Sequence, residues 1–232
     1  YTHELFHHFQ KYYCGDGKYK DASSGDFTSE TTANWVSASI NDSKDEKNVF
    51  SGWATHYVLN SNKTINWENL KLEIENLNNT WPSIIVDLYK ANVDNKKLTE
   101  FSDLINTCIG NIKNENRTET LNSLAKLYEY IPVFLEKIVP NEQQVELAKT
   151  KVEVIKAYVN IDFENWDGLK GNLDSATSNF EPILNNTNES EKEYNIRKAY
   201  VLLQEFKNAV DTKDKDLLFM KYKNLMEELI IL

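Results

Sequence analysis

The feature that most constrains the fold is a long series of helical apolar patterns between Asn66 and Ile231. Apolar residues recur there every three or four positions, as on one face of an α-helix, and no stretch shows the strict alternation of a strand. Proline should interrupt the pattern at Pro82, Pro132 and Pro140. The chain is therefore expected to be all-α, with helices over residues 66–78, 82–91, 96–113, 118–138, 142–159, 165–184, 190–210 and 213–231.

Composition narrows the class of protein and its partners. Of the 232 residues, 41% are hydrophobic, which is enough for a globular core. The net charge of -10 and the lack of a basic block argue against nucleic acid and anionic membrane surfaces as partners. No apolar run is long enough for a membrane span. Cys14 and Cys108 are the only cysteines, and they could form one bridge or stay free.

The helical part also resembles itself at a shift of about a hundred residues. Residues 57–131 can be laid on residues 158–229, which brings Trp67 near Trp166 and Pro82 near Pro182. A duplicated helical unit is one interpretation. The other is coincidence, since amphipathic helices align easily with one another.

The first sixty residues have a different character. Apolar spacing predicts a helix over residues 2–13, and a loop rich in Gly, Asp, Lys and Ser follows over residues 14–28. Ser29 can cap a second short helix that ends near Ile40. A polar stretch over residues 41–48 then leads to an aromatic segment over residues 49–59.

The first predicted helix carries the spacing of a zinc site, H-E-x-x-H. His3 and His7 are four residues apart, so their imidazoles lie on one helical face and can reach one Zn²⁺. Glu4 is then placed to deprotonate a metal-bound water, whose pKa zinc lowers to about 7. The pattern therefore indicates hydrolytic chemistry with a zinc cofactor.

A catalytic zinc site needs a third protein ligand, and Glu30 is the leading candidate. It begins a helix that the preceding glycine-containing loop can fold back against the first. Asn34 lies one turn later on the same face and could hydrogen-bond a ligand histidine. An acidic residue after the Ser29 cap also has a structural explanation, because it complements the helix dipole.

Together, the stretches His3-Glu4-Leu5-Phe6-His7-His8-Phe9-Gln10 and Ser29-Glu30-Thr31-Thr32-Ala33-Asn34-Trp35 resemble the gluzincin metallopeptidases, especially secreted bacterial ones. In that family the two histidines and the later glutamate bind zinc, and the glutamate of the first motif is the general base. The resemblance implies that His3, His7 and Glu30 are ligands, that Glu4 is the base, and that the substrate is a peptide or protein.

The sequence departs from the family in two ways. Thr31 replaces the glycine that usually follows the third ligand. Gluzincins also place a substrate-binding β-sheet before the first motif, and here that motif starts at residue 3. We therefore expect residues 1–60 to be the C-terminal part of a truncated zincin catalytic domain, inactive alone for want of that sheet. Residues 61–232 would be an α-helical accessory domain.

His56 and Tyr57 allow two interpretations. Either could donate a hydrogen bond to the oxyanion of a tetrahedral intermediate, which would make them catalytic. Alternatively, they belong to an aromatic helix that packs beneath the site.

For the whole chain the sequence predicts a secreted or cell-surface zinc endopeptidase. The alternative is a non-enzymatic helical-bundle binding or scaffold protein of the cell surface, in which the histidines hold no metal.

Overall fold

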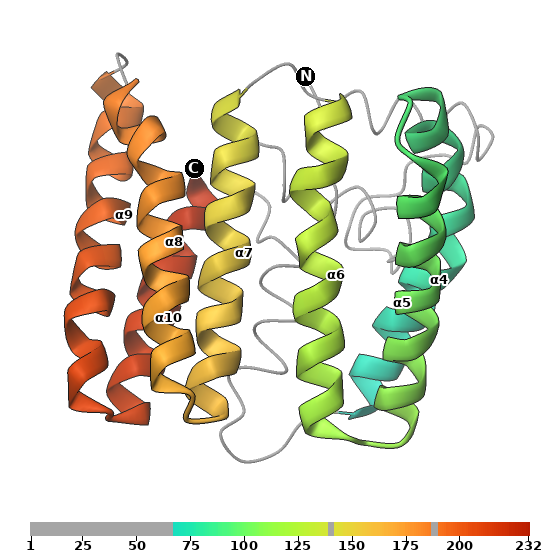
Figure 1. Cartoon of the computed structure of the whole chain (residues 1–232), viewed down its shortest axis with the longest axis horizontal. Helices are drawn as coiled ribbons and strands as arrows, with labels where there is room; N and C mark the ends of the chain where they lie inside the picture. The colour runs from blue at the N-terminus through green and yellow to red at the C-terminus, as the bar shows by residue number, and fades with distance from the viewer. Residues whose placement is uncertain (1–66, 139–141, 187–189) are drawn as a thin grey trace, which may run out of the picture. The chain divides into compact units, whose positions relative to one another are not determined.

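The computed structural model describes residues 67–138, 142–186 and 190–232, and these ranges contain helices and no strand. The prediction of an all-α fold is confirmed for them (Figure 1). The chain divides after Tyr130, within α6, into two compact units, which are described separately below. The elements are α4 (Trp67–Lys90), α5 (Asn95–Lys113), α6 (Arg117–Ile138), α7 (Glu142–Asp162), α8 (Trp166–Asn185), α9 (Ser190–Ala209), the 3₁₀ turn η2 (Val210–Thr212) and α10 (Lys215–Ile231).

The connections that the structure describes in full, those before α5, α6, α8 and α10, are short and share one arrangement. In each, a non-glycine residue with positive φ follows one helix, and an Asn or Asp close behind it caps the next. Lys213 (φ 53°) is followed by Asp214, whose carboxylate accepts a hydrogen bond from the Leu217 amide at 3.1 Å. Such caps satisfy amides that the first helical turn leaves without partners, and each stabilises a helix by about 1 kcal/mol.

In the first unit, α4 and α5 pack antiparallel. Trp81 of α4 lies against Phe101 of α5, with ring centroids 4.4 Å apart, and its indole N–H donates to Ser102 Oγ at 2.7 Å. Near the other end of α4, Lys71 Nζ is 3.5 Å from the Glu115 carboxylate, which follows α5. The sequence order of these pairs reverses between the two helices, which fixes their antiparallel direction.

Helix α6 turns back along α5. Asn111 Nδ2 of α5 donates to Ser123 Oγ of α6 at 3.3 Å, close to the turn that joins the two helices. Further away, Phe101 meets the ring of Tyr130 edge-on, with centroids 5.5 Å apart. Side chains at the end of α5 therefore meet the start of α6, as in an antiparallel hairpin.

The second unit contains a four-helix bundle of α7, α8, α9 and α10. Each helix packs against the next, and α10 packs against α7, so the four helices close a ring (Figure 1). All neighbours are antiparallel, which gives up-down-up-down topology with short loops. The pairs that establish this order are Glu153 with Asn172, Asp174 with Lys207, Glu205 with Lys221, and Tyr158 with Phe219 and Tyr222.

Large apolar side chains fill the bundle interior. Phe180 of α8 and Phe206 of α9 are fully buried, and so are Leu218 and Leu225 of α10. Removing a buried phenylalanine side chain typically costs 3–5 kcal/mol, roughly. This core is therefore the main source of stability in the second unit.

The break predicted at Pro82 is wrong, because α4 runs from Trp67 to Lys90 without interruption. A proline inside a helix costs about 3 kcal/mol through its lost N–H bond and its ring clash. Pro82 lies on the exposed side of α4, while Trp81 and Ile84 beside it are buried. Burial of two such side chains contributes about 1.5–3 kcal/mol each, which outweighs the proline.

Pro132 likewise lies inside α6, so the interruption expected there is absent, and the predicted helix over residues 118–138, which includes Pro132, is confirmed. Pro140 falls outside the described residues. Apart from these breaks, the predicted helices match the described ones to within a few residues at each end.

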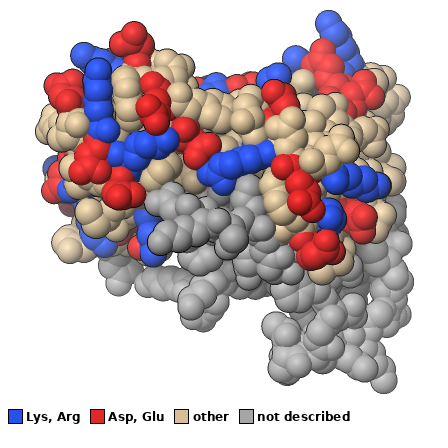
Figure 2. All heavy atoms as spheres, turned by 90° about the horizontal axis from the view of Figure 1, so that it is seen from below, with Lys and Arg blue, Asp and Glu red and all other residues tan. Residues whose placement is uncertain are grey.

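Within the described ranges, no helix is long and apolar enough to cross a membrane. On the face drawn in Figure 2, acidic and basic side chains are interspersed over the described helices. Many of them pair at helical spacing, as Arg197 does with Glu193 and Lys90 with Asp87. Exposed pairs of this kind contribute at most about 1 kcal/mol each.

Candidate functional site

The residues predicted to carry zinc chemistry lie outside the described residues. These are the ligands His3, His7 and Glu30, the base Glu4, the supporting Asn34, and the candidate donors His56 and Tyr57. Every histidine of the chain lies between positions 3 and 56. Among the described helices, no group of three or more His, Cys, Asp or Glu side chains is placed to hold a metal ion.

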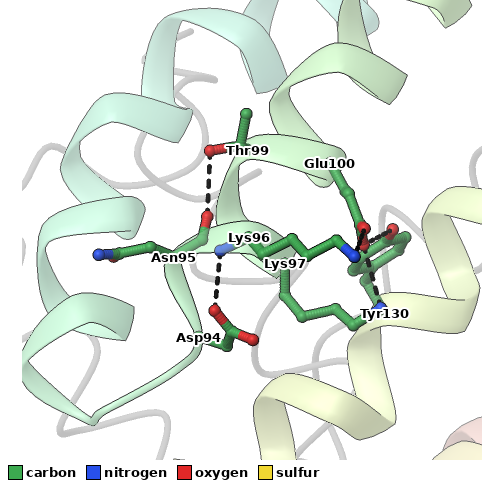
Figure 3. A network of polar contacts seen from close by, with 7 residues as sticks. All are labelled: Asp94, Asn95, Lys96, Lys97, Thr99, Glu100 and Tyr130. Carbon is green, nitrogen blue, oxygen red and sulfur yellow. Dashed lines mark hydrogen bonds and ion pairs between the residues drawn. The ribbon is translucent and has the colours of Figure 1, made fainter.

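The most connected polar cluster of the first unit joins α5 to α6. Glu100 of α5 accepts two hydrogen bonds at 3.0 Å, from Lys97 Nζ on its own helix and from the Tyr130 hydroxyl on α6 (Figure 3). Lys97 also lies over the Tyr130 ring, with Nζ 5.6 Å from the centroid. Asp94 caps the start of the same helix by accepting from the Lys96 amide at 2.9 Å.

The electrostatics of this cluster follow from its hydrogen bonds. The bond from Lys97, followed by the one from Tyr130, lowers the pKa of Glu100. The bond to Glu100 raises the pKa of Lys97, and partial burial, followed by the same carboxylate, raises the pKa of Tyr130. Each group is thus held in its ordinary protonation state at neutral pH. The cluster is therefore better suited to joining α5 to α6 than to transferring protons.

A series of hydrogen-bonded side chains, called the ladder below, joins α7 to α8. Asn172 Nδ2 donates to Glu153 at 2.6 Å, Asn160 Nδ2 donates to Asn172 at 2.6 Å, and Asn165 Nδ2 donates to Asn160 at 2.8 Å. The Asn165 side-chain oxygen accepts from the Gly168 amide at 3.2 Å and caps α8. Four residues thus link the helix cap to the middle of the bundle.

Besides buried tyrosines, three other titratable groups are buried among the described residues. Burial lowers the pKa of Lys151 on α7 to about 8, and burial raises the pKa of the free Cys108 thiol to about 11 despite its hydrogen bond with Ser123. Glu228 of α10 is 3% exposed and forms an ion pair with Lys198 of α9. The three groups lie on different helices, and Cys108 belongs to the first unit.

Sequence reasoning missed all of these polar features. The spacing of Lys97 and Glu100 predicts a local ion pair, but nothing in the sequence joins Tyr130 to it. Lys151 lies on the apolar face of α7. A lysine on such a face was the sequence feature from which its burial could have been predicted. Of the five tryptophans of the chain, Trp81 is buried, whereas Trp67 and Trp166 are half-buried. The remaining two lie outside the described residues.

A scan against known protein families finds no matching family, and searches of curated proteins and of solved structures find no matching protein or structure.

Proposed function

We propose that this chain carries the zinc centre of an endopeptidase, with His3, His7 and Glu30 as the zinc ligands and Glu4 as the general base. One sequence feature carries the proposal: the H-E-x-x-H motif is followed by a predicted helix, with Ser29 as its candidate cap, that would supply both Glu30 and Asn34. A chance H-E-x-x-H string would lack such a second helix. Two imidazoles and a carboxylate are also the ligand set found in one class of zinc peptidases.

Each side chain has a definite task in this proposal. Bound zinc would polarise the scissile carbonyl and acidify a coordinated water. Glu4 would accept the proton of that water and deliver it to the departing amine nitrogen. Asn34 would hold a ligand histidine in one ring orientation through a hydrogen bond. The reaction is hydrolysis of a peptide bond in a peptide or protein substrate.

Metal analysis of the purified chain tests the ligand assignment. We expect about one zinc per chain, as three protein ligands and one water require. His7→Ala should abolish binding, and Glu30→Gln should weaken it. His8→Ala is the matched control, because His8 follows His7 directly and, on the predicted helix, would face away from the proposed ligands. Equal zinc loss in the His7 and His8 variants would refute the assignment.

A second pair of measurements tests the base. Glu4→Gln should keep zinc, because Glu4 is not a ligand, and should lower peptide cleavage by roughly 10²–10⁴-fold, the usual contribution of a general base. Cleavage is measured on a mixed peptide library, in the longest natural form of the protein that contains this chain. A variant that cleaves as fast as the parent would rule Glu4 out.

The second candidate is a helical-bundle binding or scaffold protein of the cell surface. It is favoured by the closed bundle of α7 to α10 and by large apolar side chains exposed on α9. Tyr194 is 70% exposed and Val201 is 54% exposed, and a spacing of seven puts them on one helical face. A chain that contains no zinc after purification in zinc-supplemented buffer would support this candidate against the first.

A further inference from the structure

Helices α4 to α6 and helices α8 to α10 bury matching positions, at an offset of 99 residues between α4 and α8 and of 98 residues between the other two pairs. The five buried positions from Leu70 to Ile84 on α4 correspond to five of the six buried positions from Leu169 to Ile183 on α8. The correspondence continues from α5 to α9 and from α6 to α10. The matched buried pairs are Leu70/Leu169, Ile74/Leu173, Leu77/Ala176, Trp81/Phe180, Ile84/Ile183, Leu98/Ile196, Phe101/Ala199, Ile105/Leu203, Cys108/Phe206, Ile112/Val210, Thr120/Leu218, Leu124/Tyr222, Leu127/Leu225, Tyr128/Met226 and Ile131/Leu229.

The turns correspond as closely as the cores. Glu115 (φ 52°) precedes Asn116 before α6, and Lys213 (φ 53°) precedes Asp214 before α10. In both turns the second residue accepts a hydrogen bond from the amide three residues later, at 3.2 Å for Asn116 and 3.1 Å for Asp214. The turn before α8, with Glu164 (φ 56°) ahead of Asn165, has the same geometry, so the evidence lies in the placement of the two turns at the same offset of 98 residues as the cores around them.

Contacts between helices correspond too. The Glu100–Tyr130 hydrogen bond joins α5 to α6, and the Lys198–Glu228 ion pair joins α9 to α10 at the matching positions. Trp81 meets Ser102 where, in the second unit, Phe180 stacks on Tyr200 with centroids 6.4 Å apart. The order α4–α5–α6 is thus a second version of α8–α9–α10, matched in burial, in turns and in tertiary contacts.

Helix α7 has no counterpart within the described residues of the first unit. In the second unit it closes the bundle by packing against α8 and α10. Its Tyr158 is 1% exposed and contacts Phe219 and Tyr222, with ring centroids 4.8 Å and 5.0 Å away. At the matching positions α6 carries Leu121 and Leu124.

These two leucines belong to a buried face of α6 that points away from α5. Ser123 and Tyr130 face α5, as their hydrogen bonds show. At 100° per residue, Leu121 lies about half a turn, and Leu124 slightly more than a quarter turn, around the helix from those two residues, yet the leucines are only 2% and 6% exposed. This α6 face therefore needs a partner other than α5.

We propose that residues 49–59 occupy this face as the first helix of a second four-helix bundle, with Tyr57 against Leu121 and Leu124. Tyr57-Val58 matches Tyr158-Val159, and Asn66-Trp67 matches Asn165-Trp166 where the next helix begins. Tyr57 precedes Trp67 by ten residues and Tyr158 precedes Trp166 by eight, so only the connection differs in length. Tyr57 is then a core residue rather than an oxyanion donor, and the catalytic region ends before Val49. The inference does not depend on zinc.

Two measurements on the full chain test it, and the first needs no substitution. Hydrogen exchange followed by mass spectrometry should find the amides of residues 49–59 slowed at least about 100-fold relative to an unstructured peptide, as expected for a packed helix. Exchange at the unstructured rate would overturn the proposal, and this result does not depend on whether any variant folds.

The second measurement is a double-mutant cycle in urea. Tyr57→Ala and Leu124→Ala should each lower the unfolding midpoint of the first unit, and together they should lower it clearly less than the sum of the two shifts. The control combines Tyr57→Ala with Tyr222→Ala, because Tyr222 is the residue of the other unit that corresponds to Leu124. The shifts in midpoint caused by these two substitutions should be additive. Additive shifts for Tyr57 and Leu124 would refute their contact.

Discussion

The two glycines of α8 provide a sharp test of the ladder that joins α7 to α8. A Cβ at Gly168 would lie 2.3 Å from Asn165 Nδ2 and 2.9 Å from Asn160 Oδ1, so the Asn165 side chain must move. A Cβ at Gly171 meets nothing within 4 Å. Both positions are helical, so replacement by alanine should gain about 1 kcal/mol from helix propensity in each case.

At Gly168 two losses oppose that gain. The helix cap made by Asn165 contributes about 1 kcal/mol, and its hydrogen bond to Asn160 contributes a further 1 kcal/mol, roughly. Gly168→Ala should therefore destabilise the second unit by about 1 kcal/mol, whereas Gly171→Ala should stabilise it by about the same amount. The expected difference between the variants is about 2 kcal/mol.

Because a chain of two units need not unfold in one step, the assay must report on α8 itself. Hydrogen exchange of the α8 amides over a series of urea concentrations gives their opening free energy directly. Gly110→Ala in α5 is a further control, since it also has open space and belongs to the first unit. If Gly168→Ala stabilised α8 as much as Gly171→Ala does, the ladder would have no energetic role.

Other buried groups yield predictions of similar kind. Burial lowers the pKa of Lys151 from 10.5 to about 8 in the folded state, so the unfolded chain binds more protons between these values and stability should rise with pH across that window. Lys151→Met should remove this rise, as urea titrations at pH 7, 8, 9 and 10 would reveal. Lys198→Met should cost about 3 kcal/mol, because it leaves the buried Glu228 without its cation, whereas Glu228→Gln should cost less, because Lys198 is half-exposed. Equal losses from the two substitutions, measured by urea unfolding, would contradict that asymmetry.

The positions of most helices could be predicted from the sequence because they depend on local chemistry. Apolar spacing marks the buried face of each helix, and in the structure Asp94 and Asp214 cap the starts of α5 and α10. The same local reasoning fails at Pro82, where the penalty of one residue is outweighed by the burial of its neighbours Trp81 and Ile84. Propensity is a weak term whenever a helix has a core to pack against.

The candidate zinc site could be predicted from the sequence for a related reason. On the predicted helix, His3, Glu4 and His7 would lie within about one turn, and spacing alone would bring the two histidines to one face. The assignment of Glu30 needs a fold that brings a second helix to the first, and this remains a prediction. The polar clusters of the described helices depend on tertiary packing in the same way. No local pattern connects Glu100 with Tyr130, which lies thirty residues later.

By itself, then, the sequence determined the all-α class, the approximate helix boundaries and the spacing of a candidate metal-binding helix, since each depends on residues within a few positions of one another. Only the tertiary structure decided that α7 to α10 close into a ring and that Lys151 and Glu228 are buried. It also decided that two sets of three helices bury matching positions. A periodic pattern states which face of a helix is apolar, but which other helix covers that face depends on contacts between residues far apart in the chain.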